Sequence, residues 1–104
     1  MQVSVIVPTY NEKENIESLA TQLLALPTSV RIIVVDDNSP DGTGEIADRL
    51  AMENVGRVSV IHRPGKLGLG TAYIAGFKEA LAEGADLVCS MDADFSHNPR
   101  CVPY

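Results

Sequence analysis

Apolar residues along the chain gather in four short continuous runs, separated by three longer stretches in which they recur every three or four positions. The runs cover residues 3–7, 30–35, 58–61 and 87–91. Runs without polar alternation are typical of strands in a parallel sheet that is covered on both faces. The first intervening stretch has one apolar helical face, formed by Ile16, Leu19, Ala20, Leu23 and Leu24. The pattern therefore predicts a β-α-β-α-β-α-β chain of the α/β class.

Polar residues and prolines indicate where the helices begin and end. Asn11, with Glu14 three residues later, has the spacing of a capping box and predicts the start of the first helix, which Pro27 ends. Residues 39–42 (Ser-Pro-Asp-Gly) are turn-forming and lead into the second helix. The third helix is expected over residues 68–83, with a glycine directly after it.

Right-handed crossovers restrict the order in which the four strands lie in the sheet. We expect the order 3-2-1-4, in which the direction of the connections reverses between the first and fourth strands. Ligands of open α/β sheets bind at such a point, in the crevice outside the carboxyl ends of the strands. The loops at this point are residues 8–12 and 92–94, so we expect them to line a binding site.

Acidic residues follow two of the predicted strands directly. Asp92 and Asp94 come after the fourth apolar run, and Asp36 and Asp37 come after the second. Buried carboxylates without a partner are costly, so these residues are either solvated or neutralised by a cation. Mg²⁺ and Mn²⁺ prefer such oxygen ligands and bind through one or two carboxylates plus substrate phosphates. The alternative for both pairs is turn chemistry, and we expect Asp36 or Asp41 to serve structure while Asp37 faces the ligand.

Three other features near these loops each have two interpretations. Tyr10 is either a core aromatic or an exposed ring that stacks on a base, and its polar loop favours the second. Residues 68–70 (Gly-Leu-Gly) either cradle a phosphate or allow close packing of helix on sheet. Arg63 and Lys66 are either solvated or in contact with a diphosphate.

Length, charge and cysteine content narrow the classes of function. A chain of 104 residues has room for one domain, residues 1–104, and its net charge of −6 argues against a nucleic-acid-binding surface. No apolar stretch approaches the ~18 residues of a membrane span. Cys89 and Cys101 have no metal-binding spacing, so we expect inert packed thiols in a reduced, cytoplasmic setting.

Four motifs occur in order along the chain. They are residues 7–12 (VPTYNE), 34–43 (VVDDNSPDGT), 66–73 (KLGLGTAY) and 91–97 (MDADFSH). In this order they resemble the N-terminal, donor-binding half of a family 2 glycosyltransferase, over essentially the whole chain. The third motif narrows the resemblance to the dolichol-phosphate (polyprenol-phosphate) mannosyltransferase group.

The resemblance implies a GT-A fold, a Rossmann-like three-layer α/β/α arrangement that binds a nucleotide sugar, here GDP-mannose, with Mg²⁺ or Mn²⁺. It assigns the nucleotide-sugar contacts to Pro8, Tyr10, Glu12, Val35, Asp37, Asp92, Ala93 and Asp94. It assigns the metal ion to Asp92, Asp94 and Ser96, with Asp94 as the catalytic residue. Ser96 stands where many relatives carry Gln, and its hydroxyl can also reach a metal ion or the water bound to it.

The implied reaction transfers mannose, with inversion, to a dolichyl or polyprenyl phosphate. That acceptor is already anionic, so no strong general base is needed, and the charge developing on the leaving diphosphate is what a divalent ion stabilises. The family's acceptor-binding residues lie beyond position 104. The alternatives are a truncated nucleotide-binding fragment without transfer activity, or a family 2 transferase with another donor, such as UDP-glucose, or another acceptor. We expect the full-length enzyme to act at the cytoplasmic face of a membrane, and the fragment to self-associate over the edge of its fourth strand.

This chain lacks the motifs that define two other classes of α/β domain. A receiver domain requires an Asp after the third strand, where this chain has His62 and Arg63. A nicotinamide-binding domain requires GxGxxG after the first strand, where this chain has residues 8–12 (PTYNE).

Overall fold

A computed structural model describes residues 2–27, 29–65, 68–93 and 100–103. In chain order its elements are β1 (Val3–Thr9), α1 (Ile16–Leu24), β2 (Val30–Asp36), α2 (Thr43–Glu53), β3 (Val58–His62), α3 (Leu69–Ala82), β4 (Leu87–Ser90) and β5 (Arg100–Pro103). The four predicted strands and three predicted helices are all present, and the α/β class is confirmed. The sequence pattern did not predict β5.

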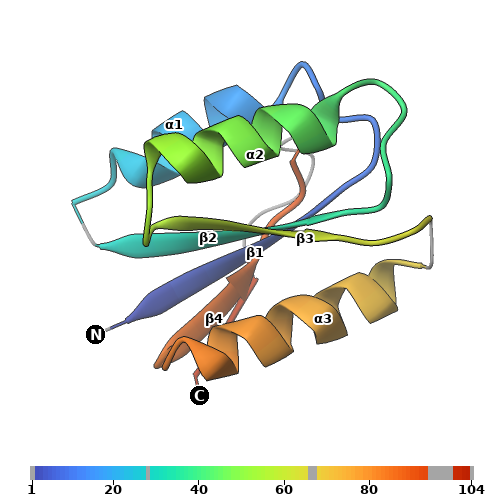
Figure 1. Cartoon of the computed structure of the whole chain (residues 1–104). Coiled ribbons are helices and arrows are strands. Elements are labelled where there is room, and N and C mark those ends of the chain that lie inside the picture. The colour runs from blue at the N-terminus through green and yellow to red at the C-terminus, as the bar shows by residue number, and fades with distance from the viewer. Residues whose placement is uncertain (1, 28, 66–67, 94–99, 104) are drawn as a thin grey trace.

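The sheet has the order β3-β2-β1-β4-β5, and β1 to β4 pair in parallel. The predicted order 3-2-1-4 is therefore confirmed. Figure 1 shows α1 and α2 against one face of this sheet and α3 against the other, which gives three layers. β5 pairs antiparallel with β4, from Leu87 opposite Pro103 to Ser90 opposite Arg100. The expected uncovered edge on the fourth strand was thus wrong, because residues 100–103 return along it.

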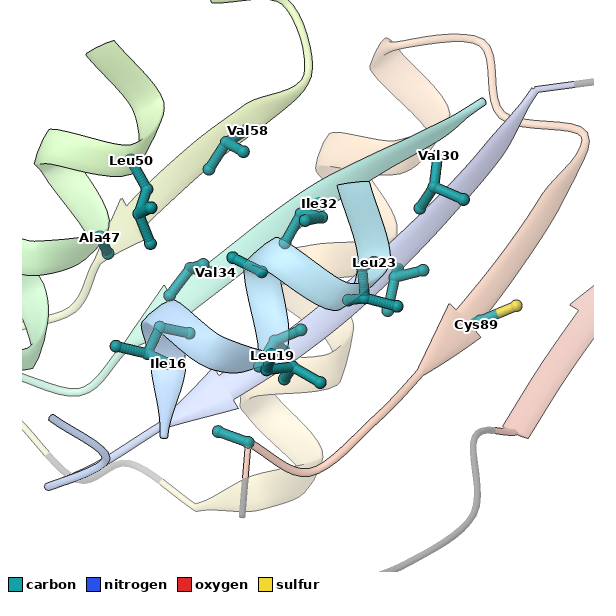
Figure 2. Close-up of a cluster of buried hydrophobic side chains, with 14 of the residues drawn as sticks. Ile16, Leu19, Leu23, Val30, Ile32, Val34, Ala47, Leu50, Val58 and Cys89 are labelled. Atoms are coloured by element: carbon teal, nitrogen blue, oxygen red, sulfur yellow. The ribbon is translucent and has the colours of Figure 1, made fainter. Parts of the chain in front are cut away.

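Alternate residues of the central strands pack into two separate apolar clusters. On one face, Val5 and Val7 of β1 belong to the same cluster as Ile16, Leu19 and Leu23 of α1. Figure 2 shows these three α1 side chains directed toward the sheet. On the other face, Ile6 packs with Ala72 and Ala80 of α3. Because both faces of β1 and β2 are covered by helices, both sets of alternate positions must be apolar, which explains the continuous runs.

Helix α3 lies very close to β1 at Gly76. A Cβ atom added there would lie 2.5 Å from Cγ2 of Ile6, closer than two carbon atoms can approach without movement. The neighbouring contacts on this helix face come from Ala72 and Ala80, which are also small. Small side chains on α3 therefore set the distance between the helix and the sheet.

The first helix begins later than the capping-box spacing predicts. α1 starts at Ile16, and its N-cap position is Asn15, which makes no side-chain capping hydrogen bond. Asn11 has a φ of +57°, a left-handed conformation and not the extended one that an N-cap residue adopts. The prediction of Asn11 as N-cap with Glu14 was wrong because the segment after β1 is fixed by contacts with a distant loop instead.

The structure also differs from the expectation that the cysteines are unbonded thiols. Cys89, in β4, is disulfide-bonded. Cys101, the second cysteine of the chain, is its register partner on β5. Cys89 is therefore not an inert packed thiol, and it gives no support to the inference of a reduced setting. Among the helices that the structure describes, none has the length and apolar character needed to cross a bilayer.

Candidate nucleotide-sugar site

The carboxyl ends of the parallel strands meet at one edge of the sheet. Thr9, Asp36 and His62 are register partners at the ends of β1, β2 and β3. β4 ends at Ser90, which lies opposite Ile6 and not opposite the end of β1. The amide of Met91 still donates to the carbonyl of Ile6 at 3.0 Å, so the chain continues beside β1. The loops that follow β1, β2 and β4 therefore converge where the sequence predicts a binding site.

Asp36 is a structural residue at this edge. Only 2% of it is exposed, and its Oδ1 accepts hydrogen bonds from Thr9 Oγ1 and Ser39 Oγ, both at 2.7 Å. Its Oδ2 accepts the amide of Ser39 at 3.1 Å. These three donors compensate for burying the carboxylate. The structural role expected for Asp36 or Asp41 is thus observed for Asp36, which ties the end of β1 to the loop after β2.

Asp37, the neighbouring acidic residue, forms an ion pair with Arg63. Arg63 Nε donates to Asp37 Oδ1 at 2.6 Å and Nη2 donates to Oδ2 at 2.8 Å. The guanidinium also donates to Thr71 Oγ1 at 2.7 Å and to the carbonyl of Gly68 at 3.2 Å. Arg63 thus joins the end of β2 to the start of α3. The solvated interpretation of Arg63 is therefore wrong, because its guanidinium is engaged by protein groups, and its contact with a diphosphate stays a prediction.

The charge of this ion pair is well stabilised. The hydrogen bonds from Arg63 to Asp37 raise the guanidinium's pKa above its ordinary value, against the opposing effect of burial, and the Asp37 charge adds to the rise. The side chains of Arg63 and Asp37 are only 9% and 11% exposed. A charge-assisted, two-point contact of this kind fixes both side chains in orientation.

Tyr10 and Glu12 lie in the segment between β1 and α1. Tyr10 is 38% exposed, as the base-stacking interpretation requires. Glu12 is half-buried; its Oε2 accepts a hydrogen bond from Asn15 Nδ2 at 3.1 Å, and its amide donates to Thr43 Oγ1 at 3.0 Å. The side chain of Glu12 is therefore held in one orientation beside the start of α1.

Asp41 also has a structural role, at the start of α2. Its Oδ1 accepts the amide of Thr43 at 3.0 Å, and its Oδ2 accepts the amide of Lys13 at 3.1 Å. Burial opposes ionisation of this carboxyl, but the hydrogen bonds from Thr43 and Lys13 outweigh it and hold its pKa below the ordinary value of 3.8. Asp41 is therefore a negatively charged anchor for two chain segments at neutral pH.

The remaining residues assigned to the site differ in how much of their surface is exposed. Val35 and Ala93 are 0% and 2% exposed and belong to the two apolar clusters, so their side chains offer no free surface to a ligand. Pro8 and Asp92 are half-buried. Asp94 and Ser96 lie outside the described residues.

The metal site stays a prediction from the sequence. Asp92 is described, and its carboxylate oxygens are the donors that Mg²⁺ and Mn²⁺ prefer. Within the described ranges, no group of three or more His, Cys, Asp or Glu side chains is arranged to hold a metal ion. The other two assigned ligands, Asp94 and Ser96, are not among those residues.

The two glycines at the start of α3 show no close packing against the described part of the chain. A Cβ added at Gly68 or Gly70 would have no atom of those residues within 4 Å, so they give no support to the helix-packing interpretation. Gly68 has a φ of +101°, which other residues rarely adopt.

Sequence reasoning missed three residues that organise the site. Arg63 was not connected with Asp37, Ser39 was treated only as part of a turn, and Thr43 only as the last residue of the motif at 34–43. A signal was present for Arg63, since it follows β3 directly and lies level with the end of β2, where Asp37 needs a cation. Ser39 lies in the loop after β2 and Thr43 is the first residue of α2, and short hydroxyl side chains are common at both kinds of position.

A family model described as glycosyl transferase family 2 matches residues 4–104 of the chain. The chain is 50% identical over 96 residues to a polyprenol monophosphomannose synthase of Mycolicibacterium smegmatis, covering 92% of this chain and 36% of the relative. It is 48% identical over 103 residues to an undecaprenyl-phosphate mannosyltransferase of Micrococcus luteus, covering 99% and 42%. The chain thus spans less than half the length of these relatives.

Among solved structures, a mannosyltransferase from Pyrobaculum calidifontis in complex with GDP-Man and Mn²⁺ has a similar fold. The TM-score is 0.78 at 28% sequence identity, and the match covers 88% of this chain and 27% of that one. The expected GT-A architecture is confirmed by this similarity together with the sheet order.

Proposed function

The chain belongs to glycosyltransferase family 2, and we propose that it is the nucleotide-sugar-binding part of an enzyme that transfers mannose from GDP-mannose to a polyprenyl or dolichyl phosphate. The observation that carries the proposal is the 50% identity over 96 residues with a polyprenol monophosphomannose synthase. The geometry supports it, because Tyr10, Glu12 and Asp37 lie on loops at the edge where α/β sheets bind ligands. Residues 1–104 form the donor-binding domain in this proposal.

In the proposed reaction, an oxygen of the acceptor phosphate attacks the anomeric carbon of mannose. A bond forms between that oxygen and the carbon, and the bond from the carbon to the diphosphate breaks, so that GDP leaves and the configuration inverts. The acceptor is already an anion, so the reaction requires no strong base from the chain. The task of the chain is to bind and orient the donor.

The proposed cofactor is Mn²⁺ or Mg²⁺, held by Asp92, Asp94 and Ser96. When bound, a divalent ion supplies positive charge to the diphosphate oxygens. The solved mannosyltransferase with GDP-Man and Mn²⁺ supports this assignment. Asp94 is proposed as the catalytic residue because it would hold this ion. Pro8, Val35 and Ala93 are proposed as further contacts of the nucleotide sugar.

Titration calorimetry of the chain with GDP-mannose, in Mn²⁺, in Mg²⁺ and in EDTA, tests the proposal. We expect binding with a divalent ion and little binding in EDTA, because the carboxylates at the edge repel a bare diphosphate. UDP-glucose is the competing donor, and tighter binding of it would replace the proposed substrate. The matched variant is Asp92→Asn, which keeps the side-chain shape and removes the charge; equal affinity in all conditions would contradict the metal assignment.

We also propose where the full-length enzyme acts. A lipid phosphate acceptor lies in a membrane, and the proposed location is the cytoplasmic face of that membrane. Self-association of the chain stays a prediction, and its original reason does not hold since β5 covers the β4 edge. Light scattering over a range of protein concentrations measures the mass directly, and a monomer throughout would remove this prediction.

A further inference from the structure

The segment between β1 and α1, residues 10–15, lacks regular secondary structure but is held at three successive main-chain amides. The donors are the amides of residues 11, 12 and 13, and the acceptors are Ser39 Oγ at 3.0 Å, Thr43 Oγ1 at 3.0 Å and Asp41 Oδ2 at 3.1 Å. We call Ser39, Asp41 and Thr43 the loop clamp. In Figure 1 the connections from β1 to α1 and from β2 to α2 run together at one end of the molecule.

The two hydroxyl groups of the loop clamp have fixed directions. Ser39 Oγ donates to Asp36 Oδ1 at 2.7 Å, and Thr43 Oγ1 donates to Asp41 Oδ1 at 2.5 Å. A hydroxyl has one proton, so an oxygen whose proton points to a carboxylate presents only lone pairs elsewhere. Those lone pairs accept the amides of the first segment. Each carboxylate thus sets the direction of a hydroxyl, and each hydroxyl sets the position of an amide.

The first segment needs this support because Asn11 has a left-handed backbone. Its φ of +57° is uncommon for a residue other than glycine and persists only where the surroundings hold it. Asn11 lies between Tyr10 and Glu12, so its conformation decides where those two side chains point. Because the segment is already ordered in the free chain, it does not lose conformational entropy when the ligand binds.

We propose that the loop clamp positions Tyr10 and Glu12 for nucleotide-sugar binding, and that Ser39, Asp41 and Thr43 are positioning residues for this site. The inference rests on the proposed function, because it takes the pocket to be one for a nucleotide sugar. It gives the motif at 34–43 a second task besides supplying Asp37. The clamp residues shape the pocket through the main chain of the neighbouring loop.

A pair of substitutions at Thr43 separates its hydroxyl from its shape. Thr43 is completely buried, Thr43→Val keeps the size and removes the acceptor, and Thr43→Ser keeps the acceptor. Thr43→Val removes both the hydrogen bond to Asp41 and the one that holds the amide of Glu12. We expect it to weaken GDP-mannose binding in Mn²⁺ about tenfold, the effect of losing the hold on that amide. Thr43→Ser should bind like the unsubstituted chain. Ser39→Ala, which removes the acceptor for Asn11, should act in the same direction as Thr43→Val.

The control for general destabilisation is Gly76→Ala, on the opposite face of the sheet from the clamp. We expect it to lower stability while leaving GDP-mannose affinity unchanged under conditions where circular dichroism shows a folded chain. Unchanged affinity in both Thr43→Val and Ser39→Ala, or equal weakening by Gly76→Ala, overturns the clamp proposal. If the unsubstituted chain does not bind GDP-mannose, the proposed function itself is wrong and the clamp proposal fails with it.

Discussion

Arg63 holds Asp37 at two points, with its Nε 2.6 Å from one carboxylate oxygen and its Nη2 2.8 Å from the other. The two residues are 26 positions apart in the chain, at the ends of neighbouring strands. Since Asp37 is an assigned nucleotide contact, its orientation toward a ligand depends on Arg63. This dependence leads to the first prediction.

Arg63→Met should destabilise the fold by about 3 kcal/mol, because it leaves the carboxylate of Asp37 without its cation in a nearly buried position. Adding Asp37→Asn should restore part of the loss, since the uncompensated charge is then gone. Urea unfolding of both single variants and the double variant measures the coupling. Strictly additive losses in the double variant would mean that the two side chains do not depend on each other.

Gly76→Ala should lower stability by about 1–3 kcal/mol, because the added methyl group would overlap Ile6 in a packed interface. The matched control is Gly70→Ala in the same helix, where an added Cβ meets no atom of the described residues within 4 Å. That change should be neutral or stabilising by up to about 1 kcal/mol, from the higher helix propensity of Ala. Thermal or urea unfolding decides, and equal losses at both positions would contradict the close approach at Gly76.

Ser4→Ala should raise stability by about 1 kcal/mol. Ser4 is fully buried in β1, and its hydroxyl has no hydrogen-bond partner in the described part of the chain. Thr9→Val is the informative comparison at the other end of β1, because the hydroxyl of Thr9 donates to Asp36. Removing that hydroxyl should lower stability by about 1–3 kcal/mol. A loss in both variants would indicate that Ser4 has a partner after all.

Glu83→Gln should stabilise the chain at pH 7 but not at pH 4. Burial raises the pKa of Glu83 above its ordinary value of 4.5, the charge of Glu79 adds to the rise, and the hydrogen bond from Ser59 opposes it. The folded chain therefore binds this proton more tightly than the unfolded chain, and stability falls as pH rises through 4.5 to the folded pKa. The amide is free of this penalty above that range.

Chemical unfolding at the two pH values measures the difference between Glu83→Gln and the unsubstituted chain. Glu53→Gln serves as the control, because the Glu53 side chain is 61% exposed and its loose contact with Arg49 should matter little at either pH. A stabilisation by Glu83→Gln that is the same at pH 4 and pH 7 would show that ionisation of Glu83 is not its cause.

The sheet order could be predicted from the sequence because it follows from local pattern and general handedness. Continuous apolar runs such as 30–35 identify strands buried on both faces, and right-handed crossovers then allow few arrangements. The convergence of residues 8–12 with Asp92 at one edge follows from parallel strands alone. None of these inferences needs knowledge of an individual side-chain contact.

The parts that could not be predicted depend on contacts between distant positions. The capping-box pattern at Asn11 was outweighed by hydrogen bonds to residues 28 and 31 positions later, which no local pattern contains. The pairing of β5 with β4 and the closeness of Gly76 to Ile6 are likewise properties of the folded chain. In each case the local sequence is compatible with more than one conformation, and tertiary contacts select the one that is observed.

The three amides bound by Ser39, Asp41 and Thr43 have a consequence for transplanting this pocket into another protein. The residues at 8–12 supply the side chains that we assign to the nucleotide, but hydrogen bonds to residues of the following βα unit hold their backbone in its conformation. Grafting 8–12 alone would therefore transfer the amino acids of the motif without the contacts that maintain their conformation. The smallest transferable unit is the β1-to-α2 stretch as a whole, residues 3–53.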